Sequence, residues 1–118
     1  AEAIRLGPRD PVLAYWISNL GLASLMLGRE AEALGHLMRA IALQPGNDAR
    51  TLNLASAYAL LGRVEEARAT LQDLRRRRPE VTIAAVRAFW TAESPDPTWR
   101  AMRGRQLEGL RLAGLPEE

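Results

Sequence analysis

The sequence contains no cysteine, which excludes disulfide bonds, thiolate metal sites and a cysteine nucleophile. It has a single histidine, His36, and no neighbouring residues that would complete a catalytic triad, a metal site or a proton relay. It also lacks a glycine-rich loop of the kind that holds phosphate. These absences leave no residue to carry a reaction, so we expect a protein that is not an enzyme and that binds no cofactor or metal.

Lysine is absent as well: all 16 basic residues are arginine, yet the net charge is only +2. Such a modest charge is not typical of a dedicated nucleic-acid-binding protein. No apolar run approaches the roughly 20 residues of a membrane-spanning helix, and the first residues show no signal-peptide pattern. The sequence therefore predicts a cytoplasmic protein that does not insert into a membrane and for which nucleic acid is not the favoured partner.

Aromatic residues are scarce at 5% and β-branched residues are few, whereas alanine and leucine are abundant. Alanine and leucine are strong helix formers, so this composition favours helices over strands. A chain of 118 residues has the size of a single domain. We therefore expect one domain with an all-α fold.

An internal repeat is the main positive feature of the sequence. The phrase LGREAEAL, which begins at Leu27, returns as LGRVEEAR at Leu61, an offset of 34. At this offset Asn19, Leu20, Ala23, Leu27, Gly28, Arg29, Glu32, Ala33, Leu37 and Pro45 are identical to Asn53, Leu54, Ala57, Leu61, Gly62, Arg63, Glu66, Ala67, Leu71 and Pro79. A fixed period of this length indicates stacked copies of one structural unit.

Each copy of the repeat predicts two helices, because apolar residues recur every three or four positions. Asp10 and Pro11 form a favourable helix start, and Gly28 is expected to end the first helix in a left-handed conformation. The short Gly-Arg connection forces the two helices of a copy to run antiparallel. The expected helices are 11–27, 30–43, 48–61 and 64–77, followed outside the repeat by 82–91 and 97–113.

The repeat resembles the tetratricopeptide repeat, a helix-turn-helix unit with the pattern W-x2-L-G-x2-Y, then A-x3-F, then P. The matching positions are Ile17, Leu20, Gly21, Ser24, Ala33, Leu37 and Pro45 in the first copy and Thr51, Leu54, Ala55, Tyr58, Ala67, Leu71 and Pro79 in the second. The resemblance implies antiparallel helix pairs stacked as a short right-handed solenoid. The single domain, 1–118, then divides into the tail of a preceding repeat (1–10), two repeats (11–45 and 46–79) and a degenerate helical cap (80–118).

Residues 1–10 are assigned to the tail of a preceding repeat because of a second repeated motif. The pattern Ala-Ile-x-Leu-x-Pro occurs both at 3–8 and at 40–45. Repeats of this kind bury their faces only against neighbouring repeats. We therefore expect the chain to begin within an array, with Ile4 and Trp16 near its open edge.

The resemblance also implies a partner-binding groove, since the first helix of each pair lines a concave surface in this family. The positions carried over are Tyr15, Ser18, Asn19, Leu22, Leu25 and Met26 in the first copy and Leu52, Asn53, Ser56 and Leu60 in the second. The groove is apolar and lacks the basic residues that grip a carboxylate, apart from Arg50 at its edge. It is expected to receive a peptide or helix, which belongs to another protein, to a second copy or to the chain itself.

Four consecutive arginines, Arg75, Arg76, Arg77 and Arg78, form the densest charge run. They suit the C-terminal end of a helix, where cations interact favourably with the helix dipole, or they contact an anion such as phosphate, nucleic acid or an acidic protein. The expected function is a protein–protein interaction module. The start "IRLGPRDP" and the end "LEGLRLAGLPEE" resemble the C-terminal regulatory or scaffolding module of bacterial signalling proteins that carry an adenylate cyclase or winged-helix domain. The alternatives are self-association and weak nucleic-acid or phosphate binding through the arginines.

Overall fold

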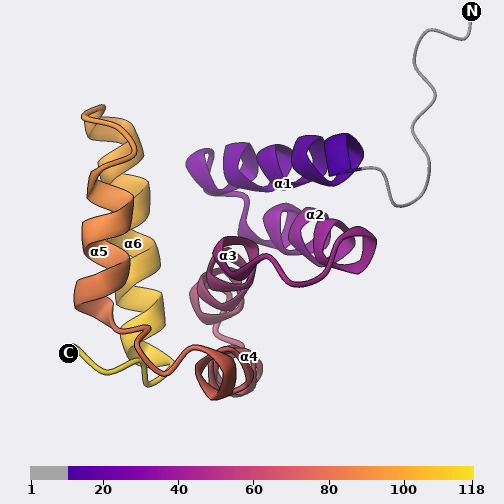
Figure 1. Cartoon of the computed structure of the whole chain (residues 1–118). Coiled ribbons are helices and arrows are strands. Elements are labelled where there is room, and N and C mark those ends of the chain that lie inside the picture. The colour runs from indigo at the N-terminus through magenta and orange to yellow at the C-terminus, as the bar shows by residue number, and fades with distance from the viewer. Residues whose placement is uncertain (1–10) are drawn as a thin grey trace, which may run out of the picture.

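The computed structural model describes residues 11–118, and within that range it contains six helices and no strand (Figure 1). The helices are α1 (Pro11–Met26), α2 (Glu30–Leu43), α3 (Asp48–Leu60), α4 (Val64–Arg77), α5 (Ile83–Thr91) and α6 (Pro97–Leu112). The all-α fold predicted from the sequence is confirmed, and each helix begins and ends within one residue of its expected position. The expectations for Asp10 and Ile4 lie outside the described residues.

Three of the helices begin with a side-chain cap. Asn47, Thr82 and Asp96 precede α3, α5 and α6, and each accepts a hydrogen bond from the backbone N–H three residues later, at 3.1, 3.2 and 2.9 Å. These oxygens satisfy N–H groups that have no partner within the helix. The second helix of each repeat starts differently, because α2 and α4 carry two glutamates in the first turn, where carboxylates favour the helix dipole.

The two repeats turn in the same way. Gly28 and Gly62 have φ of 73° and 82°, in the left-handed region that side chains disfavour. In both turns the N–H of the following arginine donates to the carbonyl five residues before it, at 2.8 Å. This arrangement closes the first helix and sends the chain back antiparallel after three residues in each repeat. The left-handed end predicted for Gly28 is confirmed.

The helix pairs stack as the repeat predicts, until the third pair changes direction. α1 packs against α2, α2 against α3, and α3 against α4. After α4 the chain does not add a helix to the far side of that row: α5 packs on α6, and α6 lies along α3 (Figure 1). The C-terminal segment then closes on α5, where the N–H groups of Ile83 and Ala84 donate to carbonyls of residues 116 and 117 at 2.9 Å.

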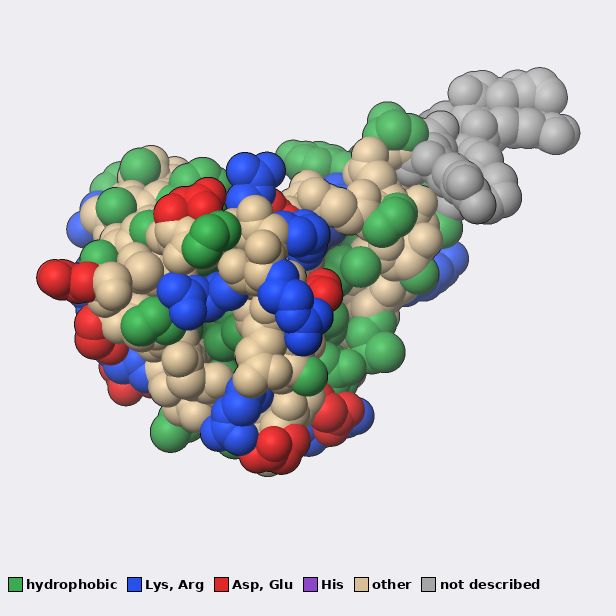
Figure 2. Space-filling view, turned by 60° about the horizontal axis from the view of Figure 1, so that its bottom comes forward, with side chains coloured by type: hydrophobic (Ala, Val, Ile, Leu, Met, Phe, Trp, Pro, Cys, Tyr) green, Lys and Arg blue, Asp and Glu red, His purple; other side chains and the backbone are tan. Residues whose placement is uncertain are grey.

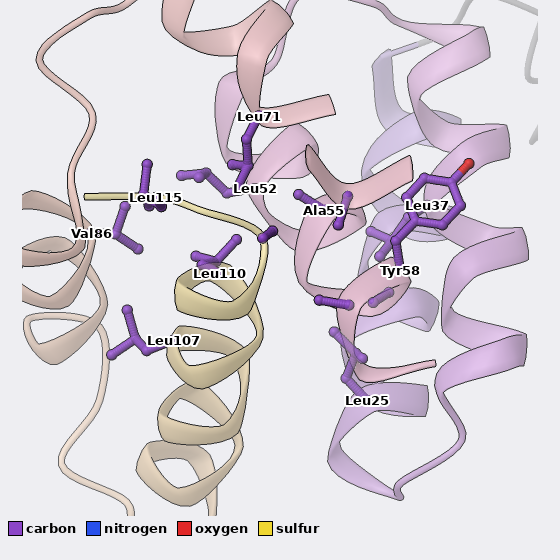
Figure 3. Close-up of a cluster of buried hydrophobic side chains, with 14 of the residues drawn as sticks. Leu25, Leu37, Leu52, Ala55, Tyr58, Leu71, Val86, Leu107, Leu110 and Leu115 are labelled. Carbon is purple, nitrogen blue, oxygen red and sulfur yellow. The ribbon is translucent and has the colours of Figure 1, made fainter. Parts of the chain in front are cut away.

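One continuous hydrophobic core joins α1 to α6 (Figure 3). Leu37 lies between the first two helices, Leu71 on α4 faces α3, and Leu110 brings α6 into contact with the same cluster; each is at most 3% exposed. Fully burying one such side chain contributes roughly 1.5–3 kcal/mol. The third helix pair therefore packs into the same core as the two repeats.

Candidate partner-binding site

The ten residues predicted to line the groove do not share one environment. Ser18, Leu25, Leu52, Asn53 and Ser56 are all at most 7% exposed. Tyr15 and Asn19 are exposed, and Leu22, Met26 and Leu60 are half-buried. The buried residues of α3 lie under α6, so the second half of the expected groove is covered by the chain itself. The sequence left this possibility open, and the structure places the C-terminal helix there.

Beside its apolar residues, the contact between α3 and α6 contains buried polar side chains and one closely packed glycine. The Gln106 amide donates to Asn53 Oδ1 at 3.0 Å and to Ser56 Oγ at 2.9 Å, both fully within the interface. One turn further along, a Cβ on Gly109 would lie 3.2 Å from Ala59 Cβ and 3.3 Å from the Ser56 carbonyl oxygen. Gly109 therefore allows a closer approach of the two helices than a larger residue would.

A buried arginine anchors this contact. Arg103 is 5% exposed, and its guanidinium donates to Asn53 Oδ1 at 2.8 Å and to both carboxylate oxygens of Glu93 at 2.9 Å. It also stacks on the rings of Trp90 and Trp99, at 4.2 and 5.0 Å from their centres. Burial lowers the pKa of Arg103, and the hydrogen bonds to Glu93 oppose that shift. Because the pKa of arginine is ordinarily so high, the group stays charged at neutral pH.

The hydrogen-bond network of Arg103 and Gln106 was not predicted from the sequence, although the sequence contains a pattern that indicates it. Arg103, Gln106 and Gly109 recur at every third position along one side of α6 and meet the small or polar side chains of α3. Asn53, which the resemblance assigned to ligand binding, accepts hydrogen bonds from both Arg103 and Gln106. Its counterpart in the first repeat, Asn19, is exposed. Within residues 11–118 no buried side-chain nitrogen or oxygen lacks a hydrogen-bond partner, so the interface is fully satisfied.

The four consecutive arginines do not converge on one point. Arg75 donates to two carbonyls of the loop that follows α4, at 3.0 and 3.1 Å, and Arg76 pairs with a carboxylate one turn earlier at 3.4 Å. Arg77 and Arg78 both bind Asp48 at the start of α3, at 3.0 and 2.9 Å. The run is therefore divided between two sides of α4, as successive helical residues must be.

The outer face of α1, continued by Leu27 in the turn that follows it, exposes several large apolar side chains. Val12, Tyr15, Trp16, Leu20 and Leu27 are 51%, 61%, 65%, 51% and 67% exposed. The helix Pro11–Met26 contains no charged residue at all. A helix that is apolar on every side is ordinarily buried on every side. The face of α1 that points away from α2 therefore has the character of a contact surface.

The repeat shows what the equivalent face does elsewhere in the chain. Trp16 and Leu20 of the first repeat correspond to Arg50 and Leu54 of the second, on α3. There α2 covers the face: Arg50 donates to the Gln44 side chain at 2.9 Å, and Leu54 packs against the core. On α1 the same face meets no helix of residues 11–118, and its residues are exposed.

Comparison with known proteins identifies the family of the repeat. A family model described as tetratricopeptide repeat matches residues 24–88, which is more than half of the chain. No curated protein and no solved structure matches the chain.

None of the described helices is long and apolar enough to cross a membrane. Among the described residues no cluster of three or more histidine, aspartate or glutamate side chains is placed to hold a metal ion.

Proposed function

The chain belongs to the tetratricopeptide repeat family, whose repeats mediate protein–protein interaction, and we propose that it binds a protein partner through the outer face of α1. The observation that carries this proposal is the exposure of Tyr15, Trp16 and Leu20 on a helix without charge, and of Leu27 directly after it. Contiguous exposed apolar surface of this kind marks interaction sites. Trp and Tyr are also the residues that most often dominate the energy of protein interfaces.

The partner expected on this face is an amphipathic helix. The equivalent face of α3 is covered by a helix, α2, so the geometry for helix packing is already present in the fold. Each apolar side chain that the partner buries contributes roughly 1.5–3 kcal/mol, which has to exceed the entropy cost of association. The groove residues of α1 that stay open, Tyr15 and Asn19 with half-buried Leu22 and Met26, border this surface and extend it.

The wider setting that we propose is a regulatory or scaffolding module of a bacterial signalling protein, of the adenylate cyclase type. It is supported by the resemblance of the segments 4–11 and 107–118 to such modules. In this setting the role of the domain is assembly, and catalysis belongs to another domain. The parent gene sequence upstream of residue 1 tests this part of the proposal directly, because it either encodes a signalling domain or does not.

Self-association is the second candidate function, and the same face supports it. A symmetric contact places a surface against itself, and α1 carries no charge that would repel its copy. Binding of nucleic acid or phosphate through Arg75–Arg78 as one cluster has less support, because the four guanidinium groups do not converge: Arg77 and Arg78 bind Asp48, whereas Arg75 and Arg76 have other partners.

The experiment combines solution mass with differential capture. Light scattering at low and high salt distinguishes a 13.0 kDa monomer from a dimer. The variant Trp16→Glu with Leu20→Glu places charge on α1, and the matched variant Phe89→Glu with Leu112→Glu places it on two equally exposed apolar residues elsewhere. We expect proteins captured by the wild type to be lost with the first variant and retained with the second. Equal capture by all three chains would contradict the α1 site, and a salt-resistant dimer abolished only by the α1 variant would favour self-association.

A further inference from the structure

The outer face of α4 differs in chemistry from the face that it repeats. In the alignment of the two repeats, Leu34, Leu37, Met38, Ile41 and Ala42 of α2 correspond to Arg68, Leu71, Gln72, Arg75 and Arg76 of α4. Four of the five positions change from apolar to polar or cationic, and only the leucine at the centre is kept. The two stripes have the same place in the repeat. The difference in their side chains therefore reflects a difference in what each stripe contacts.

On α2 this stripe receives the next helix. The Tyr58 hydroxyl of α3 lies 3.9 Å from Met38 Sδ, and Ile41 shares the lining of a hollow with Thr51 and Leu54 of α3. α2 and α3 pack along their length. The stripe is thus a helix-docking surface in the first repeat, and its own side chains there are apolar.

On α4 no following helix packs along the corresponding stripe, because the chain leaves the row after α4 and α5 packs on α6 instead; the polar positions of the stripe remain accessible, and Leu71 at its centre is buried in the core. Together with Ala113, Gly114 and Leu115 the stripe lines a hollow of about 510 Å³. Leu71 and Leu115 are 3% and 4% exposed and form an apolar floor. No acidic residue among those described lines the hollow. Figure 2 shows arginine side chains gathered over the side of the molecule that is lowest in Figure 1, where α4 lies.

The three arginines at this hollow have donors to offer an incoming carboxylate. Arg75 is oriented by two backbone carbonyls and forms no ion pair with any residue in the range 11–118. Arg68 and Arg76 pair with Glu65 and Asp73, but all four of these side chains are at least 45% exposed. Exposed pairs of this kind are worth little and exchange readily for a better partner.

We propose that the outer stripe of α4 binds an acidic amphipathic helix of another protein, placed on α4 as α3 is placed on α2. Its apolar side chains enter the hollow above the buried Leu71 and Leu115, and its carboxylates pair with Arg68, Arg75 and Arg76. Arginine suits this task because its planar fork binds carboxylates in a bidentate manner. A second copy cannot supply this helix through α1, which has no carboxylate. The inference goes beyond the function proposed above, since it concerns a different face.

The probe is a fluorescent peptide that copies residues 47–61, the helix that docks on α2, with the substitutions Arg50→Glu, Thr51→Glu and Tyr58→Glu. The apolar residue Leu54 is kept. A second peptide carries glutamine at the same three positions, so the two differ only in charge. Binding to the full chain is followed by fluorescence anisotropy at about 50 mM salt, where charge pairing is weakly screened.

We expect the acidic peptide to bind about tenfold more tightly than the glutamine peptide, and to weaken about tenfold in the variant Arg68→Gln with Arg76→Gln. The control variant Arg29→Gln with Arg39→Gln removes two exposed arginines from the other repeat and is expected to leave affinity unchanged. The variant Trp16→Glu with Leu20→Glu is also expected to retain binding, so failure of the α1 proposal does not affect this result. Circular dichroism melting curves confirm that each variant is folded.

Two results would overturn the proposal. Equal binding of the acidic and glutamine peptides would mean that the arginines do not select carboxylates. Tighter binding of pyrophosphate or of a short DNA duplex than of the acidic peptide, with the same dependence on Arg68 and Arg76, would assign the hollow to phosphate instead.

Discussion

The helices α1 and α3 occupy the same position in two copies of one repeat, yet they are buried very differently. Eight of the 13 residues of α3 are buried, against six of the 16 residues of α1. α3 packs on three helices, with α2 and α4 beside it and α6 across its remaining face, whereas α1 packs mainly on α2. The difference in burial therefore comes from the neighbours of each helix and not from its own apolar pattern.

The comparison separates residues that hold the fold together from residues that are free to serve a partner. On α3 even the polar residues Asn53 and Ser56 are used internally, by α6. On α1 the large residues Trp16 and Leu20 contribute little to the folded chain, since more than half of each side chain stays in water. Apolar side chains that do not stabilise the domain, and that are grouped on one face, are best explained by an external contact.

The largest expected effect comes from removing the residue that fastens α6 to α3. Arg103→Ala leaves Glu93 without its partner and takes a hydrogen-bond donor from Asn53, so we expect a loss of about 3 kcal/mol in the free energy of unfolding. Urea denaturation followed by circular dichroism measures it. Arg100→Ala is the matched control on the same helix, where the arginine is exposed and donates only to backbone carbonyls. Similar losses for both variants would mean that α6 does not depend on the buried network.

A smaller expected effect is the loss of stability when a leucine at the same repeat position is truncated on α3 or on α1. Leu54 packs against the core under α2, and its counterpart Leu20 is 51% exposed on α1. We expect Leu54→Ala to cost about 2 kcal/mol and Leu20→Ala less than about 0.5 kcal/mol, because the second leaves no cavity. Both are measured by urea denaturation. If the two costs are equal, Leu20 is covered in solution, and the α1 face is then paired with a second copy.

Much of the fold could be predicted from the sequence, because its signals are local. Gly28 and Gly62 mark where the first helix of each pair ends, and the fixed spacing of the repeat places the turns and the stacking order. The division of Arg75–Arg78 between two sides of α4 also follows from helical geometry, since neighbouring residues point about 100° apart. These features depend on residues close together in the chain.

The covered groove could not be predicted in the same way. The contacts of Arg103 and Gln106 with Asn53 join residues 50 and 53 positions apart, and α6 lies outside the repeat that fixed the other helices. Gly109 looks like a weak point in a helix, although its lack of a side chain is what allows α6 to approach α3 closely. Beyond the repeat, the spacing of residues no longer indicates which helix packs against which.

The smallest expected effect is a change in acid stability when the Arg–Glu ion pair at one of the two equivalent turns is removed. Arg63 Nε lies 2.7 Å from Glu66, whereas the equivalent pair, Arg29 and Glu32, is separated by 4.0 Å. The hydrogen bond from Arg63 lowers the pKa of Glu66, so this pair stabilises the folded chain above the unfolded glutamate pKa of about 4.3 and loses that contribution as the pH falls through the lower, folded value.

In the variant Arg63→Gln we expect NMR titration to show a higher pKa for Glu66, and acid unfolding to begin at slightly higher pH. Both side chains of the pair are about half exposed, at 48%, so solvent screening keeps the change small. Arg29→Gln removes the same charge from the longer pair and is expected to shift acid unfolding less. An equal shift for Arg29→Gln would show that net charge, and not the short contact, governs acid stability at these turns.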